Sequence, residues 1–119
     1  MTRRLFIVLA LLIALVPGWG SARAQGDKPV IIASFSILAD VAAQVAGDDA
    51  TILPLMPIGA NPHTYSPTAQ DVVRLSDADR VLVVGANYEE TLLPVVEEAA
   101  AGRVTVVSQC VPIRPVATG

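Results

Sequence analysis

The segment from residue 59 to residue 67 contains the only histidine of the chain, His63. Of all segments in the sequence, it has the residue types best suited to bind a ligand. Pro62 and Pro67 lie on either side of His63, and each fixes its own φ angle and favours extended geometry in the residue before it. A neutral imidazole is a good ligand for zinc, manganese or iron near neutral pH. A ligand carried on a stiff loop also loses less conformational entropy when a metal binds. His63 is therefore the candidate metal ligand of this chain.

One histidine does not make a metal site, because zinc usually takes three or four protein ligands. On spacing alone, a more ordinary interpretation of His63 is a surface or half-buried side chain that is hydrogen-bonded to a loop carbonyl. The residue types by themselves leave both interpretations open.

Other polar residues near His63 have a functional and a structural interpretation. Tyr65 could pack over a metal site, but an aromatic side chain in a loop is more often a packing anchor. Asp71 could orient the His63 ring, but its place three residues after Thr68 favours stabilisation of a helix N-terminus. We also expect a solvated helix face to carry four carboxylates that are adjacent in pairs: Glu89, Glu90, Glu97 and Glu98.

The sequence carries no motif typical of an enzyme. It has no nucleophile elbow, no HExxH pair and no phosphate-binding glycine loop. An alternative is a fragment of a secreted α/β metallohydrolase in which His63 holds a metal that activates water. No second ligand or general base lies near His63 in the sequence, which argues against it. A stand-alone interaction module is a third possibility, and we expect no enzymatic activity.

The N-terminal residues predict export from the cytoplasm. Arg3 and Arg4 precede an apolar run from Leu5 to Val16, which as a helix would rise about 18 Å, well short of the ~30 Å hydrocarbon core of a bilayer. The small residues Ala22 and Ala24 then suit a signal peptidase, so residues 1–24 are predicted to be a signal peptide. No cysteine lies near this junction, so we expect a periplasmic or extracellular product without stable membrane insertion after cleavage.

The charge and cysteine content narrow the possible partners. Removing residues 1–24 leaves five basic and eleven acidic residues, a net charge of −6, which makes a nucleic-acid partner unlikely. The single Cys110 cannot form an internal disulfide. Cys110 is therefore either a buried thiol or paired with a cysteine that this chain lacks, and we expect the first, a free thiol that behaves as a small hydrophobic side chain.

Apolar runs and turn residues predict an alternation of strands and helices after the leader. Ser36 and Thr68 are predicted helix N-caps, Gly47 a C-terminal cap, and Pro54 marks an edge strand because it cannot donate to a central ladder. Pro94 suits the first turn of a helix. The expected strands are 30–33, 51–56, 80–84 and 103–107, and the expected helices are 37–46, 68–75 and 91–101.

This order predicts an α/β fold with a mostly parallel four-stranded sheet, right-handed crossovers and helices on both faces. The strand at 30–33 is apolar throughout, and so is the strand at 80–84 after its first residue, Arg80, so we expect both strands to be buried on both faces. Such sheets bind ligands beyond the carboxyl ends of their strands. The loop with His63 directly follows the second strand and is predicted to lie at that edge.

Residues 59–67, with Thr68 and Asp71, closely resemble the signature G-x-D/N-P-H-x-Y-E-P-x-x-x-D of metal-binding solute-binding proteins that serve ABC importers of zinc, manganese or iron. The resemblance extends to the opening segment 30–41, to the helix exit 75–79 and to the strand end 84–87. It covers roughly residues 30–108.

The resemblance implies that residues 25–119 are the N-terminal lobe of a two-lobed periplasmic binding protein fold, truncated after that lobe. It implies that His63 ligates a transported divalent metal, zinc or manganese, that an ABC permease is the partner, and that the other ligands lie downstream. Ser66 replaces the usual Glu of the signature, which removes a carboxylate next to the loop. We expect this chain alone to bind metal weakly, because one imidazole leaves most coordination positions to water.

Overall fold

The computed structural model describes residues 26–114, so the predicted signal peptide, residues 1–24, lies outside the described residues. Within 26–114, no helix has the length and apolarity needed to cross a bilayer. The elements follow in the order β1 (Val30–Ala33), α2 (Ser36–Ala46), β2 (Thr51–Pro54), α3 (Ala69–Asp77), β3 (Arg80–Val83), α4 (Leu93–Ala99) and β4 (Val104–Val106).

The four strands form one parallel sheet in the order β2-β1-β3-β4, which confirms the predicted fold class. The central strand β1 pairs with β2 from Val30 opposite Thr51 and with β3 from Ile31 opposite Arg80. Pro54 ends β2 on the outer edge of the sheet, as predicted, where its missing N–H removes no ladder bond.

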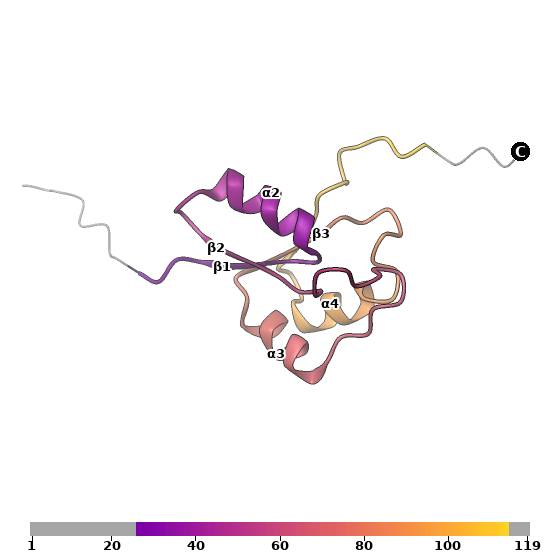
Figure 1. Ribbon diagram of the computed structural model, residues 1–119, viewed down its shortest axis with the longest axis horizontal. Coiled ribbons are helices and arrows are strands. Elements are labelled where there is room, and N and C mark those ends of the chain that lie inside the picture. Colours follow the sequence, from indigo (N-terminus) through magenta and orange to yellow (C-terminus); the bar gives the residue numbers. More distant parts are fainter. Residues whose placement is uncertain (1–25, 115–119) are drawn as a thin grey trace, which may run out of the picture.

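Helices cover both faces of the sheet, with α2 on one face and α3 and α4 on the other (Figure 1). The main core lies on the α3 and α4 side. In this core, alternate residues of the two middle strands pack against the buried faces of α3 and α4. Only alternate residues take part, because successive side chains of a strand point to opposite faces of the sheet. Fully buried members of this core include Ile32, Val81, Val83, Leu75, Val96 and Ala100.

The face under α2 is less completely covered, so the expectation that the two middle strands are buried on both faces is confirmed only in part on this side, where Ala33 is fully buried. Ile31 and Leu82 are only half-buried, while Ile32 and Val81 on the other face are fully buried. An apolar groove of about 450 Å³ runs between α2 and the sheet. We call it the α2 groove, and its lining is Ile31, Leu38, Val41, Ala42, Val45, Ala46, Ile52, Leu82 and Val107.

The helix ends follow most of the sequence signals. Gly47 closes α2 with a φ of 53°, and its N–H donates to the carbonyl of Ala43 at 2.9 Å. The predicted cap at Ser36 is wrong, because α2 begins at Ser36 itself and Phe35 occupies the N-cap position without a side-chain hydrogen bond. Pro94 lies in the first turn of α4, as predicted, but α4 is shorter at both ends than the expected 91–101.

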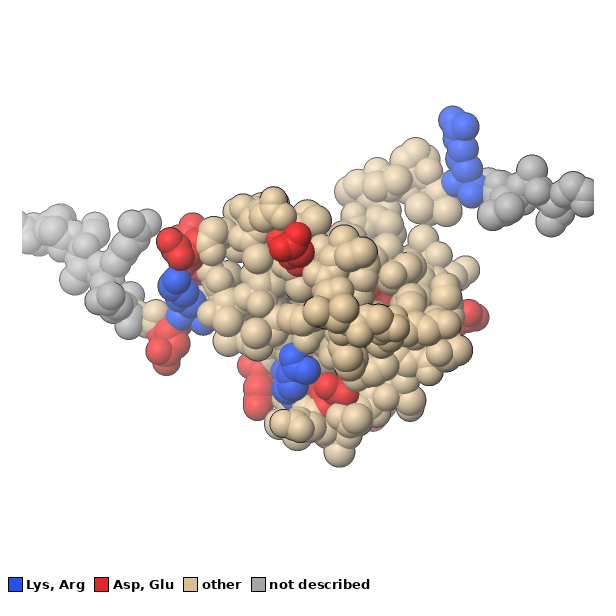
Figure 2. All heavy atoms as spheres, viewed as in Figure 1, with Lys and Arg blue, Asp and Glu red and all other residues tan. Residues whose placement is uncertain are grey.

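Charged side chains are scattered over the face of the molecule drawn in Figure 2, where uncharged residues make up most of the surface. Acidic and basic groups are interspersed on this face and form no continuous basic patch.

Candidate metal site

His63 lies in the loop between β2 and α3, beyond the carboxyl end of β2. Asn61 shapes this loop: its Oδ1 accepts a hydrogen bond from the His63 N–H at 2.9 Å, and its carbonyl accepts from the Tyr65 N–H at 2.9 Å. The His63 side chain is exposed, and its imidazole has no hydrogen-bond partner among residues 26–114. The exposed position is the one that the ordinary interpretation expects, but the bond from the ring to a loop carbonyl is absent among residues 26–114, and both ring nitrogens are available to a ligand.

Two aromatic side chains, Phe35 and Tyr88, meet beside His63, so that rings from three loops come together there. The ring centroid of Tyr88 lies 6.0 Å from that of His63, with the planes inclined at 62°, and 5.0 Å from that of Phe35. The three residues follow β2, β3 and β1, which are neighbours in the sheet. The carboxyl edge of the sheet thus brings the candidate ligand His63 together with the rings of Phe35 and Tyr88, which we call the aromatic wall. Tyr88 was not singled out from the sequence, because only the strand order makes it a neighbour of His63.

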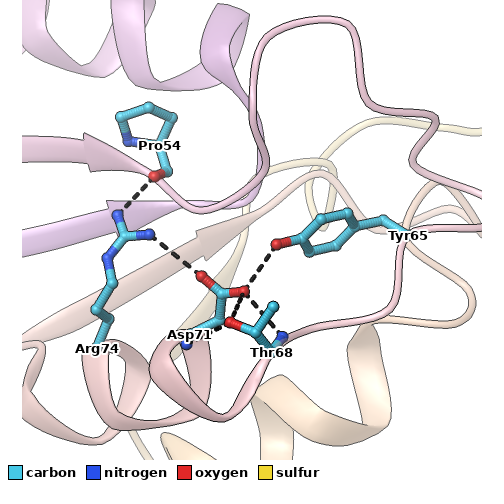
Figure 3. Close-up of polar contacts among 5 residues, drawn as sticks. All are labelled: Pro54, Tyr65, Thr68, Asp71 and Arg74. Carbon is cyan, nitrogen blue, oxygen red and sulfur yellow. Dashed lines mark hydrogen bonds and ion pairs between the residues drawn. The ribbon is translucent and has the colours of Figure 1, made fainter.

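Tyr65 and Asp71 point toward one another and hold the end of the His63 loop in place (Figure 3). The Tyr65 hydroxyl donates to Asp71 Oδ2 at 2.8 Å, and Tyr65 packs against the main core, so it is the packing anchor that was predicted. Its carbonyl accepts a hydrogen bond from Thr91 Oγ1 at 3.1 Å. These contacts fix the end of the His63 loop to α3 on one side and to the approach to α4 on the other.

Asp71 caps α3, as predicted. Its Oδ2 accepts from the Thr68 N–H at 2.9 Å, and its own N–H donates to Thr68 Oγ1 at 3.2 Å, which completes a capping box. Arg74 donates to Asp71 Oδ1 at 3.3 Å and to the carbonyl of Pro54 at 2.7 Å (Figure 3). The capping group of α3 is therefore tied to the end of β2.

The pKa values of this network follow from its hydrogen bonds. Burial acts to raise the pKa of Asp71, but the hydrogen bonds from Thr68 and Tyr65 and the charge of Arg74 outweigh it, so this pKa lies below its ordinary value. The pKa of Tyr65 is raised, first by burial and then by its hydrogen bond to the Asp71 carboxylate. Both shifts favour the state in which the tyrosine donates and the aspartate accepts.

Glu89 contradicts the expectation that all four glutamates lie on a solvated face. Its side chain is 2% exposed, and it accepts hydrogen bonds from Ser34 Oγ at 2.5 Å, from the Val84 N–H at 2.7 Å and from the Gly85 N–H at 3.0 Å. The physical reason is that Glu89 precedes α4 and belongs to the turn after β3. The remaining three of the group are exposed as expected: Glu90, Glu97 and Glu98.

The described part of the chain offers His63 no partner ligands. Residues 26–114 contain no group of three or more histidine, cysteine, aspartate or glutamate side chains placed to hold a metal ion. Cys110, which was expected to be buried, is exposed, because it follows β4 in a turn that leaves the edge of the sheet. One exposed imidazole beside an aromatic wall is thus the ligating group that the described residues provide.

The parallel sheet with helices on both faces, and an imidazole at its carboxyl edge, define the class as an α/β ligand-binding lobe. Residues 31–116 match the family described as "ZnuA: Zinc-uptake complex component A periplasmic", and the chain belongs to this family. It is a family of solute-binding proteins and not of enzymes, as expected.

Individual relatives agree with this assignment. The chain is 38% identical over 85 residues to the manganese ABC transporter substrate-binding lipoprotein PsaA of Streptococcus mitis, covering 71% of this chain and 27% of that protein. The iron ABC transporter substrate-binding lipoprotein MtsA of Streptococcus pyogenes serotype M1 is 36% identical, with the same coverage. The periplasmic zinc-binding protein TroA of Treponema pallidum has the same fold, with a TM-score of 0.66 and 32% identity over 72% of this chain and 31% of that one. The chain therefore spans about a third or less of the length of these relatives.

Proposed function

We propose that this chain is part of a solute-binding protein that captures a divalent transition metal, zinc or manganese, outside the cytoplasm and delivers it to an ABC import permease. His63 is the metal ligand in this proposal. The chain contributes one part of the site, and we expect the remaining ligands to come from outside the described residues.

The observation that carries the proposal is the state of His63 in a chain that belongs to this family. The imidazole is exposed, free of hydrogen bonds within residues 26–114, and presented by a loop that Asn61 and Tyr65 hold in place. A ligand held this way needs little rearrangement to bind a metal, which favours binding. The printed names of the relatives, which include manganese, iron and zinc, support a transition metal as the cargo.

The same proposal includes export of the chain from the cytoplasm and a membrane permease as its partner. We propose that residues 1–24 act as a signal peptide that is cleaved after Ala24, and that residues 25–119 then fold as the N-terminal lobe. Two relatives are named as substrate-binding components of ABC transporters, which supports a membrane permease as the receiver of the metal.

Calorimetric titration of the full chain with Zn²⁺ and, separately, Mn²⁺ tests the proposed role of His63. We expect binding in the micromolar range or weaker, because one imidazole leaves most coordination positions to water, and we expect His63→Ala to abolish it. Thr64→Ala, which changes the next exposed side chain of the same loop, is the matched control and should bind as the unmodified chain does.

Two results would contradict the proposal. Metal binding that is unchanged by His63→Ala would remove His63 from the site. Sub-micromolar affinity that His63→Ala abolishes, with no second chain present, would show that this chain completes a site by itself.

A further inference from the structure

The buried carboxylate of Glu89 lies under the turn that carries Tyr88. Its Oε1 accepts from the N–H of Val84 and its Oε2 from the N–H of Gly85, which are the last two backbone donors before the chain turns away from β3. A carboxylate that is 2% exposed and accepts two backbone hydrogen bonds fixes the direction in which the chain leaves the strand.

The turn itself needs such a restraint. Gly85, Ala86 and Asn87 have φ angles of 79°, 53° and 64°, so three consecutive residues are in the left-handed region, and two of them are not glycine. Side chains with a Cβ atom adopt this conformation at a cost, and it persists where the surroundings determine it. The turn ends with the Tyr88 N–H donating to the carbonyl of Gly85 at 3.0 Å, which sets the place of Tyr88.

Ser34 connects this turn to the loop after β1. Its side chain is fully buried and donates to Glu89 Oε1 at 2.5 Å, while the next residue, Phe35, places its ring 5.0 Å from that of Tyr88. The ring of Tyr88 in turn faces His63 at 6.0 Å. A continuous series of contacts therefore leads from the Glu89 carboxylate, through the turn and Tyr88, to the imidazole.

We propose that Glu89 is a positioning residue for His63: its carboxylate holds the turn after β3 so that Tyr88 forms the wall that orients the imidazole toward a bound metal. This inference rests on the proposed function, in which His63 is the ligand. Glu89 itself does not touch the metal, because its oxygens are occupied by donors from the residues that directly follow β1 and β3.

The chain has one histidine, so the imidazole signals in a proton–carbon correlation spectrum of the metal-free full chain all belong to His63. Tyr88→Leu removes the ring current beside the imidazole and defines the shift expected when the wall is lost. We expect Glu89→Gln to move the His63 signals most of the way toward their positions in Tyr88→Leu, because an amide cannot accept from both backbone donors. Glu90→Gln, which alters the neighbouring exposed carboxylate, should leave the signals unmoved.

A merely structural role for Glu89 predicts lower stability but unmoved His63 signals in the folded variant, and this result would overturn the proposal. Unmoved signals in Tyr88→Leu would overturn it as well. If Glu89→Gln fails to fold, Ser34→Ala takes its place, since it removes one donor to Glu89 and keeps the other two. A smaller shift in the same direction is then expected, and unmoved signals would count against the proposal.

Titration with Zn²⁺ separates this inference from the proposed function. We expect Glu89→Gln to weaken Zn²⁺ binding about tenfold, a size typical of outer residues that orient a ligand. Equal affinity of Glu89→Gln and the unmodified chain would overturn the proposal. If the unmodified chain shows no His63-dependent binding at all, the proposed function fails, while the metal-free spectra still decide whether Glu89 positions the imidazole.

Discussion

At the scale of single residues, Asp71 joins the His63 loop to α3. One of its oxygens accepts from the Tyr65 hydroxyl, the Thr68 hydroxyl and the Thr68 N–H, and the other accepts from Arg74. The side chain is 10% exposed, so its hydrogen bonds are largely shielded from water. Removing the charge would leave several donors without their acceptor.

We expect Asp71→Asn to lower the free energy of unfolding by about 1–3 kcal/mol at pH 7, because buried donors lose a charged acceptor. The pKa of Asp71 is lowered in the folded state, so its contribution is complete above the unfolded value of about 3.9 and is lost as the pH falls through the folded value. The difference in the free energy of unfolding between the unmodified chain and Asp71→Asn should therefore narrow below about pH 4. Urea unfolding of both proteins at a series of pH values measures this difference.

Asp77→Asn is the matched control, since Asp77 is an exposed carboxylate on the same helix. Asp77→Asn should change the free energy of unfolding by no more than about 0.5 kcal/mol. A difference between Asp71→Asn and the unmodified chain that is constant from neutral to acid pH would contradict the assignment of a lowered pKa.

The buried carboxylate of Glu89 gives a second residue-scale prediction. We expect Glu89→Gln to lower the free energy of unfolding by about 1–3 kcal/mol, because the amide leaves one buried backbone donor unpaired. Glu90→Gln should change it by less than about 0.5 kcal/mol. Thermal unfolding followed by circular dichroism compares the two variants, and equal stability would mean that the hydrogen bonds to Glu89 contribute nothing.

Glu89 also shows where prediction from the sequence fails at this scale. A pair of adjacent glutamates next to a helix is usually solvated, and nothing in the local pattern distinguishes Glu89 from Glu90. Burial of Glu89 depends on donors that directly follow β1 and β3, two strands that are far apart in the sequence and meet only in the sheet. The position of His63 in a loop directly after β2, by contrast, was predictable, because the strand and the proline-rich loop are local features, while its role as a ligand stays a prediction.

At the scale of elements, the strands were predicted better than the helix ends. Each strand is a run of β-branched and apolar residues, and this local signal is strong enough to place it within one or two residues. The start of α4 was misplaced because the residues before Leu93 form a turn whose shape depends on Glu89. Hydrogen bonds between distant segments, and not local propensity, decide such boundaries.

The close approach between the turn after β3 and β4 is testable with a pair of glycines. Gly85 has a φ of 79°, and a Cβ atom there would collide with the side chain of Val106 and lie 3.0 Å from Ser108 Oγ. Gly102 has a similar φ of 74° but open space around it. The two positions share backbone strain, and only the first also has a steric conflict.

We therefore expect Gly85→Ala to destabilise the protein by about 2–5 kcal/mol, from left-handed strain of ~1–2 kcal/mol and overpacking of ~1–3 kcal/mol. Gly102→Ala should cost only the strain, about 1–2 kcal/mol. Chemical denaturation of both variants measures the difference. Equal losses would show that β4 does not approach the turn as closely as described.

At the scale of the whole molecule, the two faces of the sheet differ in coverage. The α3 and α4 face holds the buried core, while the α2 groove leaves Val41 52% exposed and Val45 85% exposed. Apolar surface of this kind binds hydrophobic dyes. The faces can therefore be distinguished in solution.

We expect Val41→Gln to lower the fluorescence of a bound naphthalene sulfonate dye, because Val41 lines the α2 groove. Val73→Gln is the matched control: Val73 is 58% exposed but lies on α3, away from the groove, and should leave the fluorescence unchanged. Each substitution should alter stability by less than about 1 kcal/mol, since both side chains are partly solvated already. Equal loss of fluorescence in both variants would mean that the dye does not select the groove.

The strand order β2-β1-β3-β4 also has a consequence for how the chain folds. The central strand β1 is close in sequence to β2 and can pair with it early, but its other edge waits for β3, whose Arg80 lies opposite Ile31. Closing that long loop precedes any gain from the pairing, which makes such topologies slow to fold. The three loops that meet at the carboxyl edge can take their final places only after this step, so a binding surface on that edge forms late in folding.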